Sequence, residues 1–353
     1  MNLKLLFFLL TCELTISTKV FSEISDSRKH SLDSIVSSMD RSIRKDLDLA
    51  HQYLNNHAES TEEKIWLFYG YLGTFFKYDK ERMSDFKAPF YSPELTTKKS
   101  SGVCRDFSRV FEYLCLKSDI PCFSITGKTR MPISLFIGWK LRGYSTKSTH
   151  QWNIVRVDGK WMLMDPTWTH ISSKTKVRVF DQKTKTTKSL TIISVDRTYY
   201  NPAPEFMAKS HVPIHPAFSL FSTVPTFKTM RKDPEKQRIY QRNYDYTLIL
   251  DSIWNQKGKL FSRAFVDESF HYSQVPTLNS MFRYELDITL IKPGSNHQTT
   301  PAFYDERITR IQQLTAHIQH VFGVNYSAKS QETIAILEKR KKQLEKQAKT
   351  KKR

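Results

Sequence analysis

Two segments rich in strand-forming residues, 152–157 and 160–165, meet at the dipeptide Asp158-Gly159. No other feature of the chain constrains its fold as strongly, because Asp-Gly between such segments is typical of a two-residue β-hairpin turn. The turn sets the register, which makes His150 and Asp165 diagonal neighbours on one face of the hairpin, about 7–8 Å apart at the backbone. A slip of one residue would turn one of the two side chains to the other face. The sequence therefore predicts an imidazole and a carboxylate within reach of each other.

A second local pattern precedes the hairpin. Gly102 and Val103 indicate a turn that enters an amphipathic helix beginning at Cys104, with apolar residues at helical spacing. The partial positive charge of a helix N-terminus favours a thiolate over a thiol, and Arg105 and Arg109 add cations nearby. Cys104 is therefore a candidate nucleophile.

Cys104, His150 and Asp165 together have the chemistry of a catalytic triad. The carboxylate would orient the imidazole and stabilise its charged form, and the imidazole would accept the thiol proton. Taken singly, each residue has an ordinary structural interpretation: a cysteine at a helix start, a histidine before a strand and an aspartate in a turn before Pro166. The order of helix and then hairpin makes the joint interpretation more specific than any one residue.

The N-terminus predicts export. One cation, Lys4, precedes an apolar run of about ten residues that is too short to span a bilayer, and Val20-Phe21-Ser22 fits a signal-peptidase site. We expect residues 1–22 to be removed and the protein to be periplasmic or extracellular. A lipoprotein signal with Cys12 as the lipidated residue is less favoured because Thr11 precedes it, and an uncleaved anchor is the other alternative.

Removal of this segment leaves Cys115 and Cys122 beside Cys104 in a compartment where disulfides form. Cys115 lies too far along the predicted helix to join the site of Cys104. We expect Cys115 and Cys122 to be small core residues or a pair with each other.

Composition excludes several classes of protein. The 353 residues are 39% hydrophobic, which is enough for a core and excludes a wholly disordered chain. Four cysteines are too few for a disulfide-stapled miniprotein, and ten glycines are too few for a collagen-like repeat. The formal charge is +20, but export and the lack of a recognition motif in the sequence argue against a nucleic-acid partner.

Two basic segments suggest another kind of partner. The connection 127–149 leads into His150 and has five cations and no acid, namely Lys128, Arg130, Lys140, Arg142 and Lys147. It favours an acidic or polyanionic substrate, with a solvated loop as the alternative. From Lys329 onward the tail has ten basic and three acidic residues, which would suit peripheral contact with an anionic membrane or envelope polymer, or a solvated helix.

The motifs around the three candidate residues resemble those of the transglutaminase-like superfamily. The matching blocks are Gly102–Ser108, His150–Asn153 and Asp158–Trp168, preceded by a helix and a Tyr-Asp pattern within Ile65–Asp79. Downstream, Pro204–Phe206 and His211–Pro213 are similar to the kyphoscoliosis-peptidase-like branch. The resemblance covers about residues 61–220, under half of the chain.

This resemblance implies an α+β fold with a papain/transglutaminase-like core, in which the cysteine-bearing helix packs on an antiparallel sheet. It implies Cys104 as nucleophile, His150 as general base and acid, and Asp165 as orienting residue, in acyl transfer at an amide through a thioester. The backbone N–H of Cys104 is an expected oxyanion donor, and the sequence does not identify the second donor.

No cofactor and no metal are expected. Animal crosslinking members of the superfamily use calcium, but the sequence has no calcium-loop motif. His211 and His215 have the i, i+4 spacing of metal ligands on a helix, but Pro213 lies between them and disfavours a helix.

The sequence divides into five predicted parts. They are a signal peptide (1–22), an N-terminal helical segment (23–59), a transglutaminase-like catalytic domain (60–226), a mainly helical C-terminal region (227–325) and a basic helical tail (326–353). The helical stripes of the fourth part, at about 240–255, 277–291 and 303–322, carry no chemistry that we can assign.

Two functions from different classes fit these predictions. The first is an exported cysteine-dependent enzyme that acts on a protein or peptide substrate, with hydrolysis favoured over crosslinking because water is always available as acceptor. The second is a catalytically inactive transglutaminase-like module that binds the cell envelope.

Overall fold

The computed structural model describes residues 24–84, 91–129, 149–181, 185–228, 238–255, 268, 271–273, 300–322, 325 and 327–350. The predicted signal peptide, the predicted stripe at 277–291 and most of the basic connection before His150 lie outside the described residues.

The described chain contains helices and strands in a mixed order. The helices are α1 (Asp26–Ser37), α2 (Arg41–Arg44), α3 (Leu47–Asn56), α4 (Thr61–Phe75), α5 (Lys80–Ser84), α6 (Pro93–Lys99), α7 (Cys104–Lys117), α8 (Pro204–Ala208), the 3₁₀-helix η2 (Pro216–Ser219), α10 (Tyr246–Asn255), α13 (Pro301–Phe322) and α14 (Ser327–Thr350). The strands are β1 (Lys77–Tyr78), β2 (Ser101–Gly102), β3 (Cys122–Thr129), β4 (Thr149–Val157), β5 (Lys160–Met164), β6 (Ile171–Asp181), β7 (Thr186–Val195), β8 (His211–Pro213), β9 (Val224–Pro225) and β10 (Ile239–Gln241).

A four-stranded antiparallel sheet in the order β5-β4-β3-β8 lies at the centre of the molecule. Its β4–β5 hairpin turns at Asp158 and Gly159, which have φ angles of 46° and 85°, the left-handed values that a tight hairpin turn requires. Val157 pairs with Lys160, so the predicted register is confirmed.

One face of the sheet packs against the N-terminal helices. Val155, Met162 and Met164 of the sheet share a buried core with residues of α1, α3, α4 and α7. The cysteine-bearing helix α7 contacts both β3 and β4. The predicted α+β class is therefore confirmed, with the helix that begins at Cys104 packed on an antiparallel sheet.

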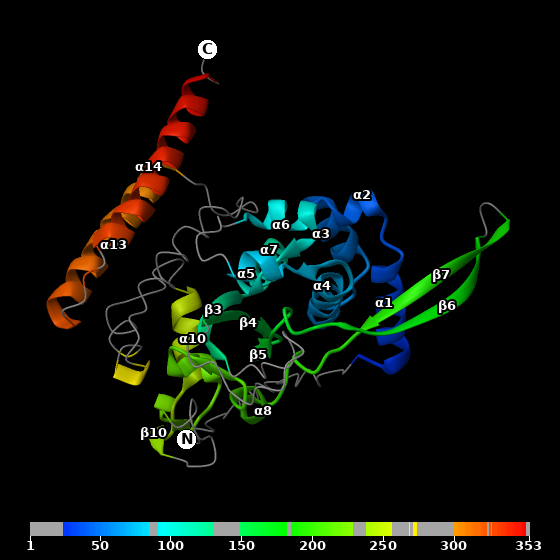
Figure 1. Ribbon diagram of the computed structural model, residues 1–353, viewed down its shortest axis with the longest axis horizontal. Coiled ribbons are helices and arrows are strands. Elements are labelled where there is room, and N and C mark those ends of the chain that lie inside the picture. Colours follow the sequence, from blue (N-terminus) through cyan, green and yellow to red (C-terminus); the bar gives the residue numbers. More distant parts are fainter. Residues whose placement is uncertain are drawn as a thin grey trace, which may run out of the picture.

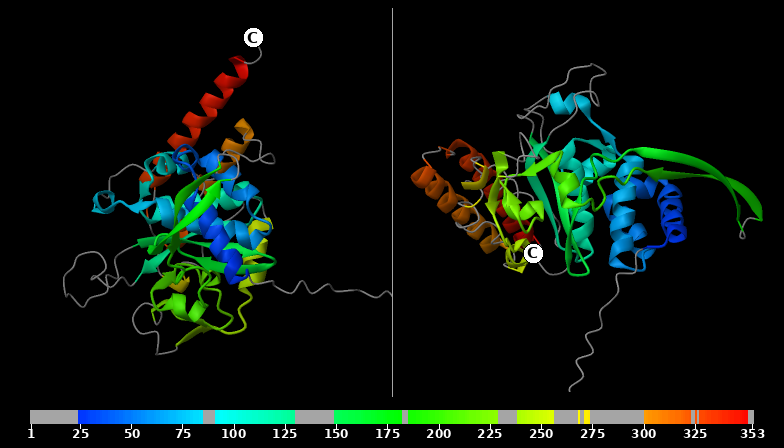
Figure 2. Two further views of the ribbon diagram at one scale, coloured as in Figure 1. Left: turned by 90° about the vertical axis from the view of Figure 1, so that its right-hand side faces the viewer. Right: turned by 90° about the horizontal axis from the view of Figure 1, so that it is seen from below.

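The opposite face is covered by residues from the C-terminal half. Phe123, Trp152 and Leu163 belong to a second core that continues into α10, α13 and α14. Figures 1 and 2 show the N-terminal and C-terminal helices on opposite sides of the sheet. Apart from the short strand β10, the elements described beyond residue 226 are helices.

Two elements extend beyond this layered body. The β6–β7 ribbon pairs along its length and projects to one side, while its base lies against α1, where the backbone N–H of Ile193 donates to Ser37 Oγ at 2.7 Å (Figure 1). The helix pair α13–α14 lies on the other side, and α14 runs out past the body. None of the helices that the structure describes is both long enough and apolar enough to cross a membrane.

Candidate active site

Cys104 is the first residue of α7, as predicted, and its side chain is half-buried. The helix start is fixed by Asp106, whose Oδ2 accepts the backbone N–H of Val103 at 2.9 Å. The same oxygen accepts the guanidinium of Arg82 at 2.6 Å, which balances the negative charge that Asp106 would otherwise bring to the thiol. Of the two cations predicted to favour the thiolate, Arg105 lies 3.7 Å from Asp106 and Arg109 donates to the carbonyl of Tyr91 at 3.3 Å.

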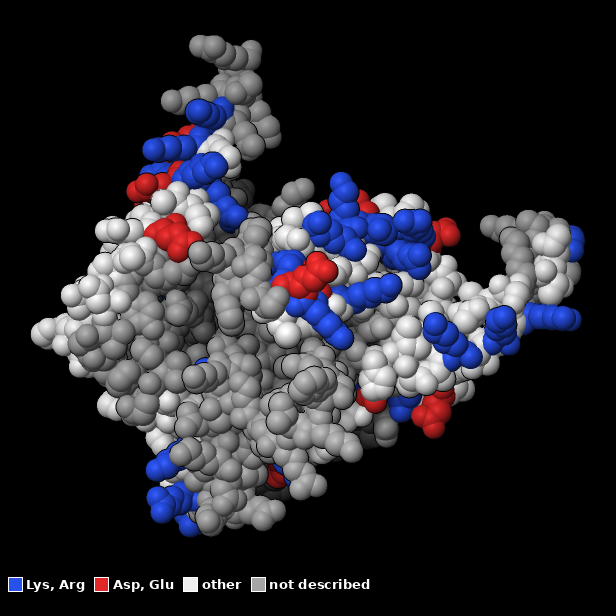
Figure 3. Space-filling view, viewed as in Figure 1, with Lys and Arg blue, Asp and Glu red and all other residues white. Residues whose placement is uncertain are grey.

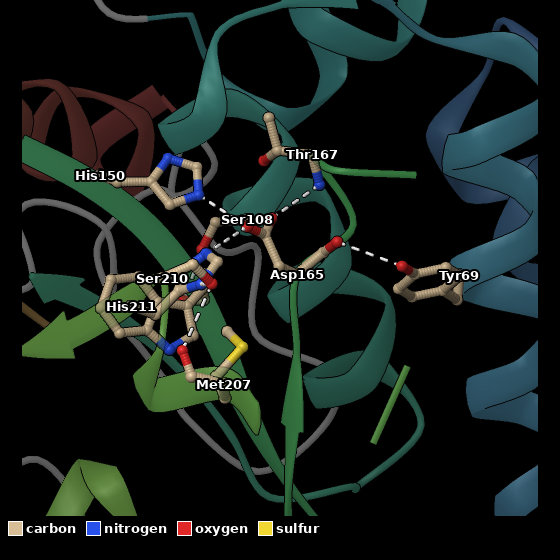
Figure 4. Close-up of polar contacts among 9 residues, drawn as sticks. Tyr69, Ser108, His150, Asp165, Thr167, Met207, Ser210 and His211 are labelled. Atoms are coloured by element: carbon tan, nitrogen blue, oxygen red, sulfur yellow. Dashed lines mark hydrogen bonds and ion pairs between the residues drawn. The ribbon is translucent and has the colours of Figure 1, made fainter. Parts of the chain in front are cut away.

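His150 and Asp165 meet where β4 begins and β5 ends, which is the arrangement that the hairpin register predicts. His150 Nε2 lies 2.6 Å from Asp165 Oδ2, and both side chains are buried (Figure 4). Asp165 Oδ1 accepts the backbone N–H of Thr167 at 2.9 Å. The backbone carbonyl of Asp165 also accepts the hydroxyl of Tyr69 at 3.2 Å.

The thiol of Cys104 forms hydrogen bonds with the side chain of His150 and with the backbone N–H of Gln151. Because Nε2 of His150 already faces Asp165, Nδ1 is the nitrogen that forms the hydrogen bond with Cys104. The structure therefore brings all three predicted residues into one hydrogen-bonded chain, from the sulfur through the imidazole to the carboxylate.

Electrostatics favour a thiolate–imidazolium pair. Burial raises the pKa of Cys104, but the charge and hydrogen bond of His150 outweigh it and bring the pKa below its ordinary value. Burial lowers the pKa of His150, but the charges of Asp165 and Cys104 and hydrogen bonds to both raise it to about 10. Burial likewise opposes ionisation of Asp165, yet His150 and His211 hold the pKa of its carboxyl well below its usual range. The imidazole of His150 thus lowers the pKa values of the two groups on either side of it, the thiol of Cys104 and the carboxyl of Asp165, and so favours the anionic form of both.

Tyr78 is a site residue that the sequence analysis did not assign. The parallel pairing of β1 with β2 sets Tyr78 opposite Gly102, and the Tyr78 hydroxyl hydrogen bonds with the backbone N–H of Cys104. Burial and the negative charge of Cys104 raise the pKa of Tyr78, so its hydroxyl keeps its proton. The Tyr-Asp pattern before the cysteine marked this position, but a single sequence gives no reason to pair it with Gly102.

His211 is a second residue that the sequence analysis left without a role. Its Nε2 lies 3.0 Å from Asp165 Oδ2, the same oxygen that receives His150. His211 belongs to β8, whereas His215 caps the 3₁₀-helix η2 and lies 3.2 Å from Glu268. The two histidines are therefore not on one helix, in agreement with the disfavoured metal pair.

Among the residues that the structure describes, one group of possible metal ligands has ligand atoms that all lie within 4.8 Å of one another: His150, Asp165 and His211. Two ligands bound to one zinc ion at 2.0–2.1 Å and a tetrahedral angle are about 3.3 Å apart. The 2.6 Å separation of His150 Nε2 and Asp165 Oδ2 is shorter and has the length of a charge-assisted hydrogen bond. The group therefore fits a hydrogen-bonded triad better than a metal centre.

Cys115 and Cys122 are buried free thiols that contact each other, away from Cys104. Of the basic connection before His150, Lys128 lies within the described residues, and Arg130, Lys140, Arg142 and Lys147 lie outside them.

The fold and this geometry define a class of α+β protein in which a thiol on a helix faces a histidine–aspartate pair on a sheet. The family model of the transglutaminase-like superfamily matches residues 48–166, and this part of the chain is a transglutaminase-like domain. A stretch of 116 residues is 24% identical to mouse (Mus musculus) kyphoscoliosis peptidase, covering 33% of this chain and 17% of that protein. The predicted family resemblance is confirmed, and the match supports the kyphoscoliosis-peptidase-like branch. The chain thus spans about a sixth of the length of this relative.

Two solved structures are also similar. One is the crystal structure of a transglutaminase, with 16% identity, a TM-score of 0.26, and coverage of 48% of this chain and 40% of that chain. The other is a candidate cysteine protease from Cytophaga hutchinsonii, with 18% identity, a TM-score of 0.27, and coverage of 46% and 49%.

Proposed function

We propose that this protein is a cysteine-dependent enzyme that cleaves or transfers acyl groups at amide or peptide bonds through a thioester. The observation that carries the proposal is the hydrogen-bonded chain from Cys104 through His150 to the buried carboxylate of Asp165. Such a chain would hold a reactive thiolate next to an acid that can protonate a leaving amine.

In the first half of the reaction, the Cys104 thiolate attacks the carbonyl carbon of the amide and the carbonyl electrons move to oxygen. The resulting oxyanion would be stabilised by the backbone N–H of Cys104 and by the hydroxyl of Tyr78, which hydrogen bond with each other in the free protein. The C–N bond then breaks, the imidazolium of His150 gives its Nδ1 proton to the departing amine, and a thioester remains on Cys104.

In the second half, the neutral imidazole accepts a proton from the acyl acceptor as the acceptor attacks the thioester. The thiolate leaves, and the imidazolium of His150 is restored. With water as acceptor the product is a carboxylic acid, and with a lysine amine it is a crosslink. We favour hydrolysis because water is always available at a half-exposed thiol.

The substrate class and the location are part of the same proposal. We propose that the enzyme is exported and that its substrate is a protein or peptide, acidic or attached to the cell envelope. An acidic substrate would complement the positive charge of the enzyme. On β6, Lys174, Lys176 and Arg178 are exposed, and alternation along the strand puts them on one face. Figure 3 shows Lys and Arg along the β6–β7 ribbon and on the projecting helix α14. These groups support peripheral contact with an anionic surface or an acidic partner.

The test is turnover of a peptide library by the purified chain without residues 1–22, beside Cys104→Ala as matched control. New peptide ends that depend on Cys104 would support a peptidase. Incorporation of a labelled primary amine that depends on Cys104 would support a transferase. If iodoacetamide reacts with Cys104 no faster than with an ordinary thiol, and neither product forms, the enzyme proposal fails and the inactive binding module becomes the better interpretation.

A further inference from the structure

The carboxylate of Asp165 has hydrogen-bond partners on three residues, His150, Thr167 and His211. Its side chain is 0% exposed, so each of its oxygens depends on donors from the protein. Oδ1 accepts a hydrogen bond from the backbone N–H of Thr167 at 2.9 Å. Oδ2 lies 2.6 Å from Nε2 of His150 and 3.0 Å from Nε2 of His211. A triad needs one imidazole on this carboxylate, and the second is unexplained by the proposed reaction.

His211 is held as a neutral donor. Burial lowers its pKa to about 4, although Asp165 acts in the opposite direction. Its Nδ1 lies 2.8 Å from the hydroxyl of Ser210. Because the ionised carboxylate of Asp165 can only accept, the single proton of a neutral His211 lies on Nε2, the nitrogen that faces Asp165. The groups that face the His211 ring are thus Asp165, His150, Ser210 and the phenol of Tyr199.

Aromatic packing fixes the orientation of the His211 ring. The ring centroids of Trp168 and Trp152 lie 4.3 Å and 5.0 Å from that of His211, and Tyr199 lies at 5.4 Å. His211 is 1% exposed, so neither water nor a rotamer change readily replaces its bond to Asp165. Figure 4 shows His150 and His211 converging on Asp165, His150 from β4 and His211 from β8, the two strands that flank β3.

The sheet creates the space for this convergence at Gly127. Gly127 of β3 pairs with His150 on one side and with Pro213 on the other, so β8 carries His211 to the face that carries His150. A Cβ at Gly127 would lie 2.2 Å from the ring of Trp152 and 2.3 Å from the carbonyl oxygen of Val212. The glycine is therefore required for Trp152 and β8 to approach each other.

From this geometry we propose that His211 is a positioning residue for the triad: its Nε2–H fixes the Asp165 carboxylate in the ionised state and in the orientation that receives His150. The inference rests on the proposed function, because it assigns His211 a part in preparing His150. His211 itself touches neither the thiol nor the reacting bond.

The test compares two amide variants of the same residue. In His211→Gln the amide nitrogen lies as far along the side chain as Nε2 of histidine, so it can still donate to Asp165. In His211→Asn the amide nitrogen ends one bond short, near the position of Nδ1. His211→Phe serves as a variant that keeps a ring and lacks any donor.

We expect His211→Asn and His211→Phe to lower kcat about tenfold relative to the wild type, the effect of losing one hydrogen bond to a charged group, with KM within about twofold. His211→Gln should restore most of kcat. The iodoacetamide reaction of Cys104 should shift to higher pH in the Asn variant, because a carboxylate that His211 no longer holds in place bonds less well to His150 and stabilises the imidazolium less. Cys115 and Cys122 report the fold in the same digest, since they react only if the core opens.

Equal kcat values and equal alkylation profiles for the Gln and Asn variants, whether high or low, would overturn the inference. Should both variants unfold, Ser210→Ala decides, because it keeps His211 and removes the partner of Nδ1. A shift of the Cys104 profile to higher pH then supports the inference, and an unchanged profile contradicts it. If Cys104 of the wild type shows no activated thiolate, the proposed function itself has failed rather than the role of His211.

Discussion

The two ends of helix α7 hold cysteines in different surroundings. Cys104 starts the helix, half-buried beside His150, and its pKa is lowered. Cys115, near the other end, is fully buried against Cys122 of β3, and burial together with Cys115 raises the pKa of Cys122 well above its ordinary value. One helix thus presents a reactive thiol at its start and buries an inert one near its end.

Comparing Cys104 with Cys122 separates two influences on the pKa of a thiol, burial and a neighbouring charge, which the sequence alone could not rank. Burial opposes the thiolate at both places, so position in the protein interior does not make a thiol reactive. The difference comes from a neighbouring cation, because His150 lowers the pKa of Cys104, whereas Cys122 faces a second thiol and the negative charge of Glu112. The helix start and two arginines, which the sequence analysis emphasised, are secondary to this imidazole.

Removal of the reactive thiol should have the largest effect. We expect Cys104→Ala to abolish turnover, because no other group can form the thioester, while Cys115→Ala and Cys122→Ala keep activity. Steady-state assays of the three variants, with circular dichroism to check folding, measure this contrast. Activity that survives in Cys104→Ala would refute a thioester mechanism.

Removal of His150, the cation beside the thiol, should return the pKa of Cys104 toward that of an ordinary thiol. We expect His150→Ala to lower kcat about 100- to 10,000-fold and to shift the pH of half-maximal Cys104 alkylation upward, toward the free-thiol value of about 8.5. In the wild type, turnover should rise as Cys104 loses its proton and fall as His150 loses its own, near the pKa of about 10. An alkylation profile that is the same with and without His150 would contradict the ion pair.

The oxyanion donor should matter for turnover but not for thiol reactivity. Tyr78→Phe keeps the ring beside Phe107 and removes the hydroxyl, so kcat should fall about 100-fold with little change in KM. Iodoacetamide alkylation forms no oxyanion, and the Cys104 rate should therefore stay the same. A parallel loss in both assays would indicate that Tyr78 acts on the thiol instead.

Substitution of the buried thiols Cys115 and Cys122 should change the stability of the protein and leave its activity unchanged. Cys115→Ala should lower the free energy of unfolding by about 1–2 kcal/mol, because the small cavity sits in a fully packed core. Urea unfolding measures this change, and mass spectrometry should find Cys115 and Cys122 alkylated only after unfolding. Alkylation in the folded protein, or a lower kcat, would show that the two ends of α7 are not independent.

The sequence predicted the parts of the site that local structure determines. The Asp158-Gly159 turn set the register that brings His150 to Asp165, and the pattern after Gly102 located the helix start at Cys104. Tyr78 and His211 were missed because their places depend on pairings between distant segments: β1 with β2, and β8 with β3. His211 lies 46 residues from Asp165 in the chain, and no turn or periodicity links the two.

The same limit applies to the second core. Apolar stripes predicted the helices near 240–255 and 303–322, and α10 and α13 occupy these positions. The stripes did not reveal that these helices cover the sheet face that carries Trp152. A stripe shows that a helix has a buried face, but not what lies against that face.

The two cores are completed at different times during synthesis. The core around α7 draws on residues from Ile24 to Val195, whereas the core over Trp152 also needs residues from Met207 to Leu337. A growing chain, made from its N-terminus, therefore contains Cys104 and His150 well before it contains the strand of His211 and the helices that cover it. A fragment cut at residue 166, where the family match stops, would leave Phe123, Trp152 and Leu163 uncovered and prone to aggregate. The thiol can therefore meet His150 before His211 has been made, and the second imidazole on Asp165 is added only once β8 has formed.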